Sequence, residues 1–176
     1  MPPRYSLAKR QAAELLKRAH VKKAPVPIEK LAAFVSAEIV HQAFSGEVSG
    51  IVYRNDERSA VIGVNSSHPI QRQRFTIAHE IGHLLLHADE NLHVDRNFPI
   101  GLRSGISSKS VDANEIESNQ FAAALLMPAD FIAEDIKPFI GTDVMFAIRK
   151  LAQQYRVSEQ AMSIRLSTLH YVELGT

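Results

Sequence analysis

An H-E-x-x-H run, His79-Glu80-Ile81-Gly82-His83, is the feature that most constrains this chain. Residues four apart lie on one face of an α-helix, with Cβ atoms about 6 Å apart. Both imidazoles can then bind one metal ion, and the glutamate lies beside that ion without being a ligand. In such sites neutral imidazoles hold Zn²⁺ while the free carboxylate accepts a proton from a metal-activated water. The run therefore predicts a metal site with His79 and His83 as ligands and Glu80 as general base.

The residues around this run predict a long, buried helix over about 68–87. Positions 77, 78, 81, 84, 85 and 86 are apolar, so the motif's polar residues interrupt a largely apolar surface. A polar group buried without a partner costs about 1–3 kcal/mol, so both histidines need partners. Two structural histidines bound to carbonyl groups are the alternative, but that interpretation gives Glu80 no role.

Length and composition favour one globular domain without disulfide bonds. A chain of 176 residues, 45% of them hydrophobic and 22% charged, can bury a core of its own. Cysteine is absent, which excludes a thiol nucleophile and cysteine-bound zinc and fits a reducing compartment. No apolar run approaches the roughly 18 residues of a membrane span, and none resembles a signal peptide. We expect a cytoplasmic protein without membrane contact, and its oligomeric state stays open.

Hydrophobic periodicity predicts an α+β fold with a helical majority. Two helices come first, over about 7–20 and 28–35. The first has a basic face that is either simply solvated or touches nucleic acid or an acidic partner. Three short strands follow, at 38–44, 49–54 and 59–65. Their valine and isoleucine content and the turns between them predict a small, largely antiparallel three-stranded sheet, packed on the metal-binding helix.

The second half of the chain predicts one long loop and four helices. The polar stretch 89–112 has no clear periodicity, so it is either a lid over the metal site or a mobile connection. A second buried helix is predicted over 113–126, and three more follow over about 130–136, 143–154 and 159–169. The expected organisation is a metallohydrolase core over 1–128 and a C-terminal helical subdomain over 129–176, packed as parts of one domain.

A catalytic zinc site needs a third protein ligand. His87 is a poor candidate, because eight residues turn a helix by 800° and place it about 80° away from His79 and roughly 12 Å along the axis. Glu115 and Glu117 open the second buried helix and are better placed. Glu115 ranks first, because Asn119 lies one turn further on the same face and could bond the far nitrogen of a ligand histidine. Glu117 remains the alternative, and either glutamate could instead stabilise the helix N-terminus.

Two long runs resemble the ImmA/IrrE metallopeptidases, also called IrrE-like zinc peptidases. These runs are RFTIAHEIGHLLLH over 74–87 and EIESNQFAAALLMP over 115–128. The resemblance continues upstream at 25–28, 49–50 and 62–65, and downstream at 151–152, 157–158 and 161–166, so it covers nearly the whole chain. One difference is Ser118, which stands where the family usually has alanine, a change of small for small that leaves the metal site undisturbed.

The resemblance implies a minimal gluzincin-like, and thus zincin-like, fold. It implies Zn²⁺ bound by His79, His83 and the first glutamate of the E-x-E pair, here Glu115, with Mn²⁺ as an alternative in the cell. Family members typically cleave an XRE-type helix-turn-helix repressor and so release genes of prophages, mobile elements or stress responses. Some are encoded beside that repressor like a toxin–antitoxin pair. The resemblance therefore implies a zinc-dependent endopeptidase whose partner is such a repressor.

The oxyanion formed during peptide hydrolysis needs a hydrogen-bond donor besides the metal. His93, Arg96 and Arg103 in the polar stretch are candidates, and the sequence does not choose among them. The predicted sheet could also offer an edge on which an extended substrate adds as a strand.

The C-terminal helices support a different function. Residues 142–155, a short link and 158–169 have the size of a helix-turn-helix, whose second helix enters the DNA major groove. The alternatives to a peptidase are therefore a DNA-binding regulator and a protein that binds the repressor without cutting it. Direct DNA binding is disfavoured, because Arg165 is the sole arginine or lysine in 159–169 and DNA binding relies on such residues for phosphate contacts.

Overall fold

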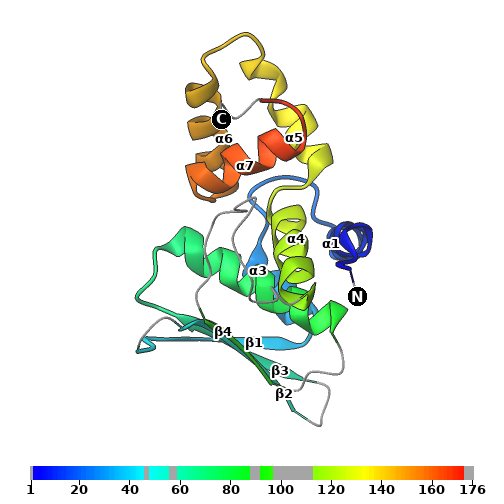
Figure 1. Ribbon diagram of the computed structural model, residues 1–176, viewed down its shortest axis with the longest axis vertical. Coiled ribbons are helices and arrows are strands. Elements are labelled where there is room, and N and C mark those ends of the chain that lie inside the picture. The colour runs from blue at the N-terminus through cyan, green and yellow to red at the C-terminus, as the bar shows by residue number, and fades with distance from the viewer. Residues whose placement is uncertain (1, 46–47, 56–58, 88–91, 97–112, 173–176) are drawn as a thin grey trace.

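The computed structural model describes residues 2–45, 48–55, 59–87, 92–96 and 113–172. Its elements, in chain order, are α1 (Tyr5–Arg18), α2 (Ile28–Phe34), β1 (Ala37–Gln42), β2 (Val48–Arg54), β3 (Ala60–Asn65), α3 (Ile70–Leu86), β4 (Leu92–Arg96), α4 (Ala113–Leu126), α5 (Ala129–Asp135), the short 3-10 helix η1 (Lys137–Phe139), α6 (Val144–Tyr155) and α7 (Glu159–Thr168). Figure 1 shows three tiers, with the sheet at the bottom, α3 and α4 in the middle and α5 to α7 at the top. The predicted mixed domain with a helical majority is confirmed.

The sheet differs from the prediction in strand number and in pairing. It has four strands in the order β1-β3-β2-β4. β1 pairs with β3 in parallel, whereas β2 lies antiparallel to β3 and β4. β3, with the sequence AVIGVN, is the most apolar strand and suits a central place, while β1 carries Glu38, His41 and Gln42 and lies at an edge. The sheet is largely antiparallel, as predicted, but the predicted number of three strands was wrong, and β1 pairs in parallel with β3 although β2 lies between them in the sequence.

β4 was missed because its polar side chains point inward. Its register pairs His93 with Val52 and Asp95 with Gly50, both on the face of β2 that is buried beneath α3. Leu92, on the outer face, is 60% exposed, whereas Asp95 is 4% exposed. This inverts the usual alternation of apolar-inward and polar-outward residues. The remainder of the predicted loop lies outside the described residues.

α3 packs on the inner face of the sheet, and α4 packs on α3 (Figure 1). The two helices approach closely at Gly82: a Cβ there would lie 3.1 Å from the Cα of Ser118 and 3.2 Å from Cδ1 of Phe121. Any side chain at this position would push the helices apart. The close approach lets polar residues one turn away on each helix reach one another.

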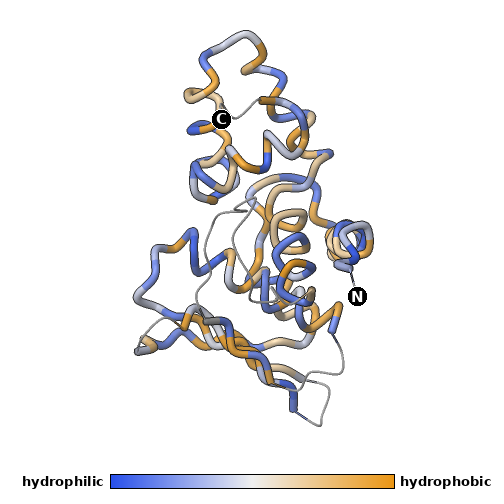
Figure 2. Tube along the Cα trace, viewed as in Figure 1, coloured by the Kyte–Doolittle hydropathy of each residue, from blue (hydrophilic) through white to orange (hydrophobic). Residues whose placement is uncertain are grey.

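One hydrophobic core joins the C-terminal helices to the rest of the chain. Leu151, Met162 and Leu166 belong to the same cluster of buried residues as Ile77 and Ile81 of α3. Hydrophobic residues occur in the sheet, in the central helices and in the C-terminal helices (Figure 2). Among the helices described, none is long and apolar enough to cross a membrane.

Candidate metal centre

α3, α4 and β4 bring four metal-binding side chains together. His79 and His83 come from α3, Glu115 from α4 and His93 from β4, and one ligand atom of each lies within 4.8 Å of all the others. The Nε2 atoms of His79 and His83 are 3.0 Å apart. The Glu115 carboxylate lies 3.4 Å from Nε2 of His79 through Oε2, and 3.2 Å from Nε2 of His83 through Oε1.

These separations suit a shared metal ion. Atoms bound to one zinc ion at 2.0–2.2 Å in a tetrahedral arrangement lie about 3.3–3.6 Å apart. The atoms of His79, His83 and Glu115 lie 3.0–3.4 Å apart. Two imidazoles and one carboxylate also make up the protein ligands of one class of catalytic zinc sites. The three residues therefore fit a zinc ion in donor type and in spacing.

Asn119 orients one of these histidines. Its Oδ1 lies 2.9 Å from Nδ1 of His79. Because a carbonyl oxygen can only accept, Nδ1 of His79 carries the proton and donates it to this bond. In the neutral ring Nε2 then keeps its lone pair, which faces Glu115 and His83, as a metal ligand requires.

Burial and neighbouring charges set the protonation of Glu115. Burial alone would raise the pKa of its carboxyl group. When the rings of His79 and His83 carry a proton on Nε2, their hydrogen bonds and charge outweigh this effect and hold the pKa of Glu115 far below its usual range. Glu115 is therefore ionised at neutral pH, as a ligand of a cation must be.

Glu80 lies next to this group but is not part of it. The side chain is fully buried, and neither carboxylate oxygen has a hydrogen-bond partner among the described residues. Glu80, His79 and Asp95 form a second group whose ligand atoms lie within 4.8 Å of one another. Burial raises the pKa of Glu80 to about 8; His79 opposes the rise, while Asp95 and Glu115 add to it. A carboxyl group with such a pKa can accept and return protons near neutral pH.

Residues 37–167 match the model of a peptidase family described as the IrrE N-terminal-like domain. The chain belongs to the ImmA/IrrE family. This confirms the resemblance drawn from the two long sequence runs.

Three relatives of this chain differ in how much of their own length it covers. "Radiation response metalloprotease IrrE" of Deinococcus radiodurans is 36% identical over 104 residues, which are 58% of this chain and 29% of that protein. The protein of the same name from Deinococcus deserti is 37% identical over 103 residues, 58% of this chain and 34% of its own length. "Uncharacterized immunity region protein 2" of Bacillus phage phi105 is 29% identical over 133 residues, 76% of this chain and 75% of that protein. The chain thus spans about a third of each IrrE protein.

The second glutamate of the ImmA/IrrE E-x-E pair turns away from the donor group. The backbone N–H of Arg4 donates to Oε1 of Glu117 at 2.7 Å, and the Arg4 guanidinium donates to Oε2 at 2.8 Å. These hydrogen bonds lower the pKa of Glu117. His87 follows α3 as its C-cap residue, and its Nε2 lies 3.8 Å from Oε2 of Glu117. Glu117 and His87 therefore form a separate cluster that joins α1 to the helix pair.

The three oxyanion candidates have different places. His93 lies in β4, where its ring stacks on that of His83 with centroids 3.6 Å apart, and its Nε2 lies 3.2 Å from Oε1 of Glu115. Arg96 ends β4, but its side chain is outside the described part of the structure, as is all of Arg103. Of the three, the structure brings His93 to the donor group.

Two features of this ImmA/IrrE site were missed from the sequence. Asp95 lies 4% exposed beside Glu80 and His79, and Gly50 on β2 lies beneath the Glu80 carboxylate. The alternation of apolar and polar residues in LHVDR was the available signal for a strand at 92–96. Gly50 can be placed beside Glu80 only when the position of β2 relative to α3 is known. No local sequence pattern gives that position.

Proposed function

We propose that this protein is a zinc-dependent endopeptidase with His79, His83 and Glu115 as metal ligands. The observation that carries the proposal is the group of donor atoms 3.0–3.4 Å apart beside the buried Glu80. Membership of a peptidase family supports it, as does the name "Radiation response metalloprotease IrrE" of the two Deinococcus relatives. Mn²⁺ accepts the same imidazole and carboxylate donors and is the alternative metal in the cell. A zincin-like arrangement of helix and sheet belongs to the same proposal.

Glu80 performs the proton transfers in this mechanism. Its carboxylate takes a proton from the attacking water and gives it to the amine that leaves when the peptide bond breaks. When bound, the metal supplies positive charge that polarises the scissile carbonyl and acidifies the water. Asn119 keeps the lone pair of His79 Nε2 directed at the donor group. His93 lies at the same group and is the proposed hydrogen-bond donor to the oxyanion.

β4 offers a place for the substrate. It lies at the edge of the sheet, as far as the described strands go, and its inward side chains include His93. An extended peptide that adds to this edge as a further strand would place its backbone beside the donor group. A loop or unfolded segment of a protein is therefore a better substrate than a folded helix.

We propose that the substrate is an XRE-type helix-turn-helix repressor and that its cleavage derepresses prophage, mobile-element or stress-response genes. The support is family membership, together with the phage relative, whose name places it in an immunity region. The enzyme and its repressor would act in the cytoplasm, where transcription occurs, in some genomes as a toxin–antitoxin-like pair. The repressor is thus the expected partner.

The test is to incubate the full chain with the repressor encoded beside it, with zinc, with manganese or with a chelator. Cleavage that needs a metal and disappears in Glu80→Gln, with metal content verified, is the expected outcome. Cleavage retained by Glu80→Gln would remove Glu80 as the base. No cleavage with either metal, but tight repressor binding, would favour the non-proteolytic alternative.

The alternative is a regulator that binds DNA or the repressor through α6 and α7. Arg165, the one arginine or lysine of α7, is 5% exposed and donates from Nε to the carbonyl oxygen of Met127 at 2.9 Å. It holds α7 against the end of α4 and is not available for a phosphate contact. This contact favours a packing or repressor-docking role for α7 over direct DNA binding. A DNA fragment shifted by the protein alone, in a salt-dependent way, would reverse that order.

A further inference from the structure

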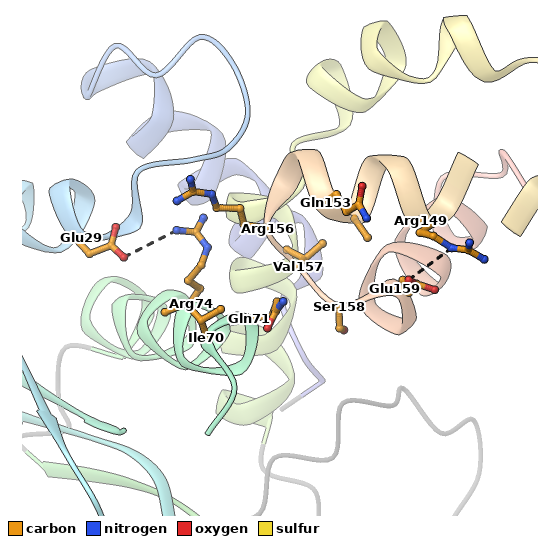
Figure 3. Close-up of a pocket in the computed structure, with 11 residues that line it drawn as sticks. Glu29, Ile70, Gln71, Arg74, Arg149, Gln153, Arg156, Val157, Ser158 and Glu159 are labelled. Atoms are coloured by element: carbon orange, nitrogen blue, oxygen red, sulfur yellow. Dashed lines mark ion pairs between the residues drawn. The ribbon is translucent and has the colours of Figure 1, made fainter. Parts of the chain in front are cut away.

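A cavity separate from the metal centre lies between the first half of α3 and the turn from α6 to α7 (Figure 3). Its volume is about 760 Å³, within the range of small-molecule sites. Arg74 of α3, Arg149 of α6 and Arg156 of the turn line it, against two carboxylates, Glu29 and Glu159. No residue that lines it belongs to the donor group of the metal centre.

The positive charge of this cavity is incompletely balanced. Glu29 lies 3.9 Å from Nη1 of Arg74, and Glu159 lies 3.9 Å from Nε of Arg149, so both pairs are loose. Arg156 forms no ion pair with any described residue. Figure 3 shows its guanidinium beside that of Arg74. Burial lowers the pKa of Arg74, Glu29 opposes this, and the charge of Arg156 lowers it further, as expected for two cations held close together.

The Arg74 side chain is held in place in the wall of this cavity. It is 4% exposed, and its Nη2 donates to the carbonyl oxygen of Val26 at 2.7 Å. A buried guanidinium held by one carbonyl and one distant carboxylate keeps donors to spare, because the group carries five N–H bonds.

Arg156 occupies a backbone position that favours glycine. It follows α6 with φ 54° and ψ 46°, in the left-handed region, and its N–H bonds to the carbonyl oxygen of Gln153. Glycine would form this helix end with less strain. An arginine here is therefore explained better by what its side chain does than by the turn itself.

We propose that this cavity binds a phosphorylated small molecule of about nucleotide size, with the phosphate between Arg74 and Arg156. Guanidinium groups bind phosphate through paired hydrogen bonds, and a phosphate dianion balances two arginines where a carboxylate balances one. The volume exceeds what a phosphate alone would fill. Ile70, Ala152 and Val157 provide apolar surface, and the amides of Gln71 and Gln153 can bond a polar ring edge. A bound ligand would hold the α6–α7 turn against α3, the helix that carries His79 and Glu80.

Calorimetric titration of the full chain tests this, with inorganic phosphate, AMP and adenosine as probes. A chelator is present throughout, so that no phosphate can bind through a metal at the metal centre. AMP is expected to bind more tightly than phosphate, and adenosine to bind far more weakly than AMP. Arg156→Gln should weaken AMP binding about ten- to hundredfold, because it removes charge-assisted hydrogen bonds.

Two further variants separate binding from folding and from general charge. Arg156→Gly should weaken AMP binding equally while leaving the melting temperature unchanged or higher, because glycine relaxes the left-handed backbone. Arg10→Gln, on the exposed face of α1, removes the same charge elsewhere and should leave AMP affinity unchanged.

Three outcomes would overturn the proposal. One is no binding of AMP or phosphate up to about 10 mM, which would mean that the binding free energy is smaller than about 3 kcal/mol. Another is equal weakening by Arg156→Gln and Arg10→Gln, which would show nonspecific attraction to a cation. The third is Arg156-dependent binding of a hexaglutamate peptide with no binding of the phosphates, which would make the cavity a docking site for an acidic peptide. None of these results depends on whether the protein cleaves a repressor.

Discussion

The Glu80 carboxylate lies against the backbone of Gly50, on the strand beneath it. A Cβ on Gly50 would lie 2.8 Å from Oε1 of Glu80 and would overlap Cγ2 of Thr76. Side-chain carbons do not approach other atoms this closely without displacing them. The glycine in β2 thus leaves the space that the carboxylate of the proposed general base occupies.

Gly50→Ala should therefore displace Glu80 and lower the cleavage rate about a hundredfold, because a shift near 1 Å at a reacting group has effects of that size. Zinc stoichiometry should stay unchanged, because Gly50 does not touch the three proposed ligands. Gly63→Ala on β3 is the matched control, since its added Cβ meets chiefly the far end of the Phe44 ring, at 3.1 Å, which can move. Equal activity of the two variants would show that Gly50 does not position Glu80.

Asn119→Ala should weaken zinc binding about ten- to hundredfold, because the variant releases the His79 ring from the hydrogen bond that Asn119 makes with Nδ1. Competition with a chromophoric chelator measures this affinity. Gln120→Ala, the next residue on α4, serves as the control for helix propensity and should bind zinc normally. Wild-type affinity in Asn119→Ala would mean that packing alone orients the ring.

Local spacing predicted the part of the site that lies within single helices. The four-residue interval of His79 and His83, and that of Glu115 and Asn119, follow from helical geometry and needed no knowledge of the fold. The structure places all four side chains together, and it places Glu117 with Arg4. The two intervals are set by residues close in the chain, whereas the contact of α3 with α4 and that of Arg4 with Glu117 are long-range.

Long-range register determined what the sequence did not predict. Asp95 and His93 reach the site because β4 pairs with β2, and Gly50 meets Glu80 because β2 lies beneath α3. The polar residues at 92–96 face inward and help to form the site. When burial is unknown, polar residues in such a stretch suggest a solvated loop. The same limitation hid the parallel pairing of β1 with β3, which depends on which strand takes a central place in the sheet.

His93→Gln should separate a substrate-binding role from a metal-binding one. A fourth protein ligand would close the metal site, whereas a catalytic site keeps one position open. We therefore expect the variant to keep zinc affinity within about tenfold while cleavage falls about a hundredfold, as for loss of an oxyanion donor. His83→Gln is the control and should lose zinc. Equal loss of zinc in both variants would show that His93 is a fourth metal ligand. The site would then be closed, and its role would be structural.

Rising pH should destabilise the metal-free protein through Glu80. Its pKa is raised to about 8 in the folded state, against about 4.3 for a free glutamate. Between these values the folded protein holds a proton that the unfolded chain has released, so the free energy of unfolding falls as pH rises, by up to about 1.4 kcal/mol per pH unit.

Urea unfolding with a chelator, from about pH 5 to pH 8, should show wild type losing stability relative to Glu80→Gln across this window. Glu14→Gln, on the exposed face of α1, controls for the loss of one negative charge. A difference between wild type and Glu80→Gln that stays constant with pH would mean that Glu80 is ionised throughout.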